Sequence, residues 1–319
     1  MSGRTGHSTG NRTYVSSVMQ TITGAALTTP TRLCFIVEEK YENDTMPSVV
    51  AEALTSWGHE VDVLRPHSML TDISSLQGNN AYDAYVLKTV SSGPGLSILE
   101  AAGAAGIATI NDHRAIRLAR DKAVAASRAR AAGLPFPTTY FASRSALLNQ
   151  VPRECYPLVI KPNNGSSCER IYRVDSPSQL ERLDLDDSGF LLAQPYLPNP
   201  GYDVKLYNTG DEVFAAVRRS PLHAGEDVVE QLIPVTPELR ALAVGVGRAF
   251  GLDIYGVDVI ETSRGWMVLD VNDFPSFGKV PDAAQRVART VLRLAHRAQA
   301  ANARFSPTAN PAIAMEASA

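Results

Sequence analysis

The stretch Val268-Leu-Asp-Val-Asn-Asp-Phe-Pro-Ser-Phe277 decides how this chain folds. Its apolar residues predict a buried strand that ends in two alternating oxygen ligands, Asp270 and Asn272. Because alternate residues of a strand point to the same face, both side chains can hold one hard cation, and Mg²⁺ suits such ligands best. The alternative is an ordinary strand end, with Asp and Asn as turn-capping residues.

A second apolar run, Ile254-Tyr-Gly-Val-Asp-Val-Ile260, predicts a neighbouring strand that carries Asp258. The segment Ser263-Arg264-Gly265 is typical of the hairpin turn that would join the two strands. Three oxygen ligands on two antiparallel strands suit a Mg²⁺ ion that bridges nucleotide phosphates.

Two segments upstream carry lysines suited to phosphate. The run Val159-Ile-Lys161-Pro162 predicts a strand, and the small polar residues 163–167 after it could offer backbone N–H groups to phosphates. Asp121-Lys122 opens a predicted helix that Gly133 ends. Of 30 Lys and Arg residues only six are Lys, and four of these lie in or beside a motif: Lys122, Lys161, Lys205 and Lys279.

In this order the elements resemble the ATP-grasp superfamily over roughly residues 32 to 298. The set is Asp-Lys before a helix, Ile-Lys-Pro before a glycine loop, a Gln hinge, Asp-x-Lys on a strand, Gly-Val-Asp and Asp-Val-Asn. The resemblance implies an α/β protein with the ATP-grasp fold, in which an N-terminal parallel α/β subdomain precedes two α+β subdomains that clamp ATP. The expected boundaries are 1–31 for a disordered tail, 32–112, 113–189 and 190–300 for the subdomains, and 301–319 for a loose tail.

The resemblance also implies roles for particular residues. ATP would be the cofactor, with Mg²⁺, which Mn²⁺ could replace, held by Asp258, Asp270 and Asn272. Relatives often have Glu at the positions of Asp270 and Gln194. The residues expected to bind the nucleotide are Lys122, Lys161, Gly165, Ser166, Ser167, Gln194, Pro195, Tyr196, Leu197 and Asp203.

The return strand of a predicted hairpin, residues 212–219, carries two arginines on opposite faces, so only one can enter the site. Arg218 and Lys205 are the expected catalytic residues, because a cation can stabilise charge on a transferring phosphoryl group or an acyl phosphate. Asp203 shares a face with Lys205, and the two could bind ribose, phosphate or substrate, or pair with each other. Ser276 and Lys279 are further candidates for substrate contact.

Two chemistries fit this scaffold. In the carboxylate–amine ligase branch, ATP phosphorylates a carboxylate and an amine displaces phosphate, giving a dipeptide or γ-glutamyl amide from amino acids. In the inositol polyphosphate kinase branch, a phosphoryl group passes to an inositol phosphate. The ending Asp-Val-Asn-Asp-Phe-Pro of residues 270–275 resembles the kinases more closely. The histidine that kinases carry after the glycine loop is absent from Ser166-Ser-Cys-Glu-Arg170, which favours the ligase.

Composition limits the partners. The formal net charge of −3 gives no electrostatic reason to expect nucleic acid or an anionic membrane. No apolar run approaches the roughly 20 residues of a membrane span. Three scattered cysteines favour a reducing cytoplasm over a disulfide framework. We therefore expect a cytoplasmic enzyme that acts on small amino-acid substrates, and a homo-oligomer is compatible with the resemblance.

Patterns in the remaining chain predict further elements. Strands at 33–37, 60–64, 82–87 and 107–110 alternate with helices at 48–57 and 95–105, which is typical of a parallel sheet covered on both faces. A helix should run to Phe250, with Thr236 as its N-cap and Pro237 as its first residue. Residues 283–298 should form the closing helix.

Overall fold

The structure, a computed structural model, describes residues 29–77, 82–88, 93–164, 170–186, 188–220, 222 and 229–305. Predictions for the N-terminal tail up to residue 28, for the phosphate-loop residues Gly165, Ser166 and Ser167, and for the tail after residue 305 lie outside these ranges. The chain divides into two units, Met1–Pro30 and Thr31–Ala319. Every element below belongs to the second unit.

The first four strands form a parallel sheet, as the alternation of strands and helices predicted. They are β1 (Arg32–Val37), β2 (Glu60–Leu64), β3 (Ala84–Lys88) and β4 (Ala108–Ile110). Their order is β2-β1-β3-β4, with every pair parallel. The helix α1 (Thr45–Ser56) follows β1, and α2 (Pro94–Ala104) follows β3.

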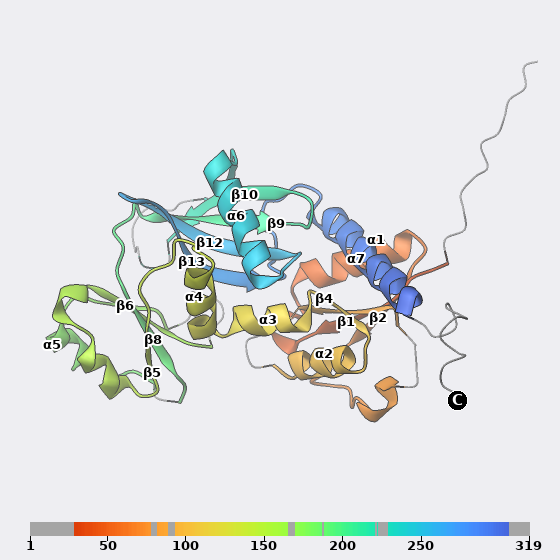
Figure 1. Ribbon diagram of the computed structural model, residues 1–319, viewed down its shortest axis with the longest axis horizontal. Helices are drawn as coiled ribbons and strands as arrows, with labels where there is room; N and C mark the ends of the chain where they lie inside the picture. Colours follow the sequence, from red (N-terminus) through yellow and green to blue (C-terminus); the bar gives the residue numbers. More distant parts are fainter. Residues whose placement is uncertain are drawn as a thin grey trace, which may run out of the picture. The chain divides into compact units, whose positions relative to one another are not determined.

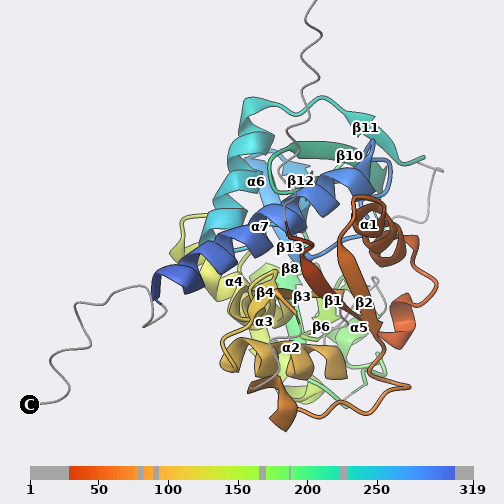
Figure 2. The same ribbon diagram turned by 90° about the vertical axis from the view of Figure 1, so that its right-hand side faces the viewer.

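Helices cover both faces of this sheet because alternate residues of β1 enter different apolar cores. Leu33, Phe35 and Val37 pack with residues of α1 and of α7 (Ala283–Phe305). Cys34 and Ile36 pack with residues of α2. The two views in Figures 1 and 2 show α7 beside α1, so the end of the chain closes the core that its first strand begins.

A second, antiparallel sheet lies in the middle of the chain. Its strands are β5 (Tyr140–Ala142), β6 (Leu158–Pro162), β7 (Tyr172–Val174) and β8 (Leu191–Pro195). They are ordered β5-β8-β6-β7 and have their own apolar core, with α5 (Pro177–Leu180) packed against it. Among the described residues, short 3-10 helices lie at Glu39–Tyr41, Ser74–Gln77, Ser145–Gln150 and Arg153–Cys155.

The third sheet is antiparallel throughout and carries most of the site described below. Its strands are β9 (Tyr202–Asn208), β10 (Val213–Arg219), β11 (Gln231–Ile233), β12 (Tyr255–Thr262) and β13 (Gly265–Asp273), in the order β11-β10-β9-β12-β13. Apolar side chains of one face, among them Val204, Leu206 and Val257, pack with α6 (Pro237–Phe250). Because side chains alternate along a strand, the residues between them project from the opposite face.

The ends of α6 follow the predicted signals. The side chain of Thr236 accepts a hydrogen bond from the N–H of Leu239, and Pro237 occupies the first turn. At the other end Gly251 adopts the left-handed backbone conformation, with φ of 75°, which a residue without Cβ tolerates best. The prediction of this helix is confirmed.

Two helices differ from the expectations. The helix α3 (His113–Arg120) was not predicted; a single residue, Asp121, separates it from α4 (Lys122–Ala131). The closing helix α7 continues to Phe305, so residues 301–305 belong to a helix rather than to a loose tail. None of the helices in the described ranges combines the length and apolarity that a bilayer crossing requires.

Candidate active site

The polar face of the third sheet collects residues that are far apart in the sequence. Strand register places Lys205 opposite Asp258, Asp258 opposite Asp270, and Arg218 opposite Asp203. Asn272 pairs with Gly256, against which Lys205 and Pro275 pack closely. The hairpin of β12 and β13 therefore brings the three predicted metal ligands together, as the alternation in the sequence predicted.

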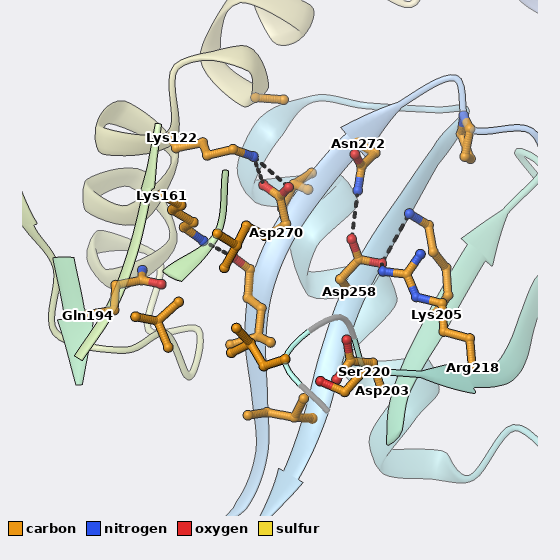
Figure 3. A pocket seen from close by; sticks show the side chains of 18 of the residues that line it. Lys122, Lys161, Gln194, Asp203, Lys205, Arg218, Ser220, Asp258, Asp270 and Asn272 are labelled. Carbon is orange, nitrogen blue, oxygen red and sulfur yellow. Dashed lines mark hydrogen bonds and ion pairs between the residues drawn. The ribbon is translucent and has the colours of Figure 1, made fainter. Parts of the chain in front are cut away.

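A cavity of about 390 Å³ covers this face. It is lined by residues of the central sheet, of the third sheet and of the N-terminal sheet, so all three sheets contribute to one continuous space. Figure 3 shows Lys122, Lys161 and Gln194 on one side of it, and Asp258, Lys205 and Arg218 on the other.

Side chains within the cavity neutralise one another. The ammonium of Lys122 lies 2.7 and 2.5 Å from the two carboxylate oxygens of Asp270. Oδ1 of Asp258 lies 3.0 Å from Nζ of Lys205 and 2.9 Å from a terminal nitrogen of Arg218. The amide nitrogen of Asn272 donates to Oδ2 of Asp258 at 3.1 Å (Figure 3).

This arrangement keeps Asp258 ionised. Burial alone would raise the pKa of its carboxyl group, but the adjacent Lys205 and Arg218 outweigh burial, so the pKa lies below its ordinary value of 3.8. Asp258 is therefore negatively charged at neutral pH and is paired with the cations of Lys205 and Arg218.

The two lysines expected to bind phosphate are held by a shared polar link. The side chain of Asn163, directly after β6, accepts a hydrogen bond from the N–H of Ala123 in the first turn of α4. This contact ties the helix that begins with Lys122 to the strand that carries Lys161. Nζ of Lys161 in turn donates to the carbonyl of Leu269 at 3.2 Å, at a β-bulge of β13.

The predicted hinge lies at the end of β8, and four of its residues line the cavity: Gln194, Pro195, Tyr196 and Leu197. The amide of Gln194 donates to the hydroxyl of Thr139 at 2.8 Å and is fixed there. The N–H of Tyr196 donates to the carbonyl of Pro157, and Pro195 has no N–H. The side-chain amide of Gln194 and the N–H of Tyr196 are therefore both engaged within the protein.

The remaining predicted residues divide into those that line the cavity and those that do not. Asp203, Lys205 and Arg218 are buried or half-buried and line the cavity, whereas Arg219 is exposed, as strand alternation required. Ser276 lines the cavity, and Lys279 is exposed and is absent from the lining.

Several lining residues were missed by the sequence reasoning, and they form the end of the cavity nearest the N-terminal sheet. They are Tyr41, Lys88, Arg120, Tyr207, Asp273 and Phe274. Lys88 is a lone charge that ends the otherwise apolar strand β3, and this was the one local signal available. Arg120 stood directly before the Asp-Lys motif and had no signal of its own.

Comparison with known proteins identifies the family. A family model described as the RimK-like ATP-grasp domain matches residues 119–293, more than half of the chain. A probable alpha-L-glutamate ligase of Pseudoalteromonas translucida is 30% identical over 250 residues, which cover 70% of this chain and 82% of that protein.

Two solved structures share the fold. D-alanine–D-alanine ligase of Bacillus anthracis, in complex with ATP, superposes with a TM-score of 0.65 at 17% identity, covering 85% of this chain and 99% of that one. The ATP-grasp ligase PsnB, in complex with its minimal precursor, Mg and ADP, has a TM-score of 0.61 at 18% identity, covering 82% of this chain and 97% of that one. The chain belongs to the RimK-like ATP-grasp domain family and is an ATP-dependent carboxylate–amine ligase.

Proposed function

We propose that this enzyme forms an amide from amino acids, either a dipeptide or a γ-glutamyl amide, through an acyl-phosphate intermediate. ATP and Mg²⁺ would bind in the cavity between the central and third sheets, with release of ADP and phosphate. The observation that carries the proposal is the set of three cations paired with two carboxylates in one cavity: Lys122 with Asp270, and Lys205 and Arg218 with Asp258. Lys161 lines the same cavity.

The donor set suits Mg²⁺. Asp270 already holds a cation with both oxygens, namely the ammonium of Lys122, and Asp258 is held ionised. In the described parts of the chain, no group of three or more His, Cys, Asp or Glu side chains could hold a metal ion. The proposed set therefore relies on the amide oxygen of Asn272 and on phosphate oxygens, which are the hard donors that Mg²⁺ prefers.

The side chains of the protein would act mainly by stabilising negative charge on the phosphate groups. With the nucleotide bound, Lys122 and Lys161 would contact phosphate oxygens, and Lys122 would exchange Asp270 for phosphate. Bound Mg²⁺ would supply further neutralisation of the phosphate oxygens. Arg218 and Lys205, both fixed by Asp258, would stabilise the charge that develops as the phosphoryl group moves.

Two bond exchanges complete the reaction. A carboxylate oxygen of the acid attacks the γ-phosphorus, the bond from phosphorus to the ADP oxygen breaks, and an acyl phosphate forms. The amine nitrogen of the second substrate then attacks the acyl carbon, the carbon–oxygen bond to phosphate breaks, and the nitrogen loses one proton. The second exchange requires no histidine or cysteine, because the acyl phosphate is already activated.

A trapping assay tests the proposal. The enzyme is incubated with ATP, Mg²⁺ and each proteinogenic L-amino acid in turn, beginning with L-glutamate, and hydroxylamine replaces the amine substrate. We expect a hydroxamate and an equal amount of ADP with at least one acid. Phosphorylation of an inositol polyphosphate, with no hydroxamate from any acid, would refute the ligase assignment in favour of the kinase chemistry.

Neighbouring arginines provide the matched control. Arg218→Ala should lower hydroxamate formation by about 100-fold, which is the usual cost of removing one preorganised charge-stabilising group. Arg219→Ala, one residue along the same strand with an exposed side chain, should remain close to the original activity. Equal losses in both variants would contradict the role of Arg218.

A further inference from the structure

Arg120 is a buried cation that neither the nucleotide motifs nor the metal set explains. It is the last residue of α3 and lines the cavity, and only 14% of its side chain is exposed. Its Nε lies 2.6 Å from Oδ1 of Asp273, a carboxylate whose side chain is fully buried at the end of β13. The guanidinium thus lies beside a buried carboxylate and also borders the cavity.

Arg120 lies at the end of the cavity nearest the N-terminal sheet. The hydroxyl of Tyr41 is hydrogen-bonded to it, and the negative charge of Asp270 also acts on it. A group bound to Arg120 would therefore lie near Asp270, one of the proposed metal ligands.

A second buried cation, Lys88, completes this end of the cavity. Its ammonium donates to the carbonyl of Phe274 at 3.1 Å and to the hydroxyl of Ser276 at 3.2 Å, and it lies 3.2 Å from Asp44. The ring of Tyr41 lies 4.8 Å from the same ammonium. Lys88 is thus engaged within the protein and fixes the wall beside Arg120.

The charges here select the ligand. Lys88 is paired with Asp44 and Arg120 with Asp273, so these four side chains together carry no net charge before a ligand arrives. A phosphate with two negative charges would unbalance it, whereas a zwitterionic amino acid would not. A guanidinium also matches the geometry of a carboxylate through two parallel hydrogen bonds.

We propose that Arg120 binds the α-carboxylate of an amino-acid substrate, a carboxylate that stays intact through the reaction. The inference rests on the proposed function, since it names the substrate class of the same cavity. Arg120 then determines specificity: a free amino acid is accepted, and the same molecule with its α-carboxylate amidated is rejected.

Binding measurements test this without requiring turnover. The proteinogenic L-amino acids and their α-carboxamides are titrated into the protein at saturating ADP and Mg²⁺, with thermal shift as the readout. We expect at least one amino acid to bind, and its α-carboxamide to bind about 10- to 100-fold more weakly, as the loss of a hydrogen-bonded charge implies.

Four variants test whether Arg120 causes this preference. Arg120→Met should remove the preference for the free carboxylate while leaving the affinity for ADP unchanged, and Arg120→Lys should retain part of the preference. Arg117→Met, one turn earlier on α3 and exposed, should behave as the unmodified protein does. The double variant Arg120→Met with Asp273→Asn removes both charges of the buried pair, and it serves if the single variant fails to fold.

The outcomes separate this inference from the proposed function. The inference about Arg120 is overturned if no amino acid binds, or if the amino acid and its α-carboxamide bind with equal affinity. It is also overturned if Arg120→Met, or the double variant in its place, weakens the binding of ADP and leaves the preference for the free α-carboxylate intact. The last result would assign Arg120 to phosphate. Failure of the hydroxamate assay, in contrast, would refute acyl-phosphate chemistry even where the carboxylate preference holds.

Discussion

The N-terminal sheet and the third sheet both bury polar side chains, but they satisfy them differently. At the end of β4, Asn111 donates to the carbonyl of Ile254 and accepts from the N–H groups of Asp253 and Ile254. On the polar face of the third sheet, Asp258 and Asp270 are satisfied mainly by the side chains of lysines and an arginine.

The two kinds of contact differ in whether a ligand can replace them. A side chain bonded to backbone groups cannot release them without disturbing the fold, because buried backbone groups need partners. An ion pair between two side chains can open when a ligand offers each partner a substitute. We therefore expect polar groups of the first kind to determine stability and those of the second kind to determine activity.

Removing Asp270 should produce the largest effect on activity. Asp270→Ala deletes a carboxylate that holds a cation in the cavity, so turnover should fall by at least ~100-fold. The free energy of unfolding should change by no more than about 1 kcal/mol, since the pair with Lys122 is partly exposed. Steady-state ADP release and denaturant unfolding provide the two readouts.

The exposed residue Asp184 offers the control, and Asp184→Ala should change neither quantity. Near-normal turnover of Asp270→Ala at limiting Mg²⁺ would mean that the metal assignment is wrong.

Asn111 should show the opposite pattern. Asn111 is 1% exposed, and Asn111→Ala removes the side chain that forms hydrogen bonds with three backbone groups. The free energy of unfolding should fall by about 2–5 kcal/mol, while the folded fraction keeps its kcat. Asn149→Ala, at an exposed position, should stay within about 0.5 kcal/mol of the parent. A stable but inactive Asn111→Ala would break the comparison between the two regions.

Local sequence predicted the strands and most of the site because its signals are short in range. Asp258, Asp270 and Asn272 follow apolar runs with a period of two, and a hairpin turn separates the runs, so their meeting on one face needs only strand alternation. The N-cap of α6 is likewise a matter of adjacent residues. The ATP-grasp resemblance added the order of these pieces.

The rest depended on contacts distant in sequence. Lys122 meets Asp270 across 148 positions, and Lys88 meets Ser276 across 188, for which the chain carries no local signal. The helix α3 was missed because Asp121 both ends it and caps α4, so the two helices share one boundary residue. The subdomain boundaries, the site roles and a homo-oligomer stay predictions.

The absence of a side chain at Gly256 should have a moderate effect on turnover. An added Cβ would lie 3.0 Å from Cε of Lys205 and 3.2 Å from Cγ of Pro275, so Gly256→Ala should displace that lysine by a few tenths of an ångström. Because misplacement of a catalytic group by 1 Å can cost 100-fold, we expect turnover to fall by about 3- to 10-fold. Gly189→Ala, where a Cβ would meet no atom within 4 Å, should leave turnover unchanged. Unchanged turnover of Gly256→Ala would show that Lys205 need not hold its position.

Lys88 makes both kinds of contact, since it bonds the backbone carbonyl of Phe274 and pairs with the carboxylate of Asp44. The pH dependence of the stability that it contributes should be the smallest of these effects. Burial lowers the pKa of its ammonium below the ordinary value of 10.5, although Asp44 and Asp273 favour the charged form; Arg120 opposes it. Between the folded-state pKa and pH 10.5 the unfolded chain binds the proton more fully than the folded chain. Stability contributed by Lys88 should therefore increase as the pH rises through this window.

The measurement is the difference in unfolding free energy between the parent protein and Lys88→Met, followed upward from neutral pH. The difference should change in favour of the parent as the pH rises toward 10.5 and then level off. Lys88→Arg, whose charge persists over this range, should show no such rise against Lys88→Met. A difference that instead falls with pH would mean that Asp44 outweighs burial, and Lys88 would then belong with the exchangeable pairs of the third sheet. In that case a ligand could open its contact with Asp44 as readily as the contact between Lys122 and Asp270.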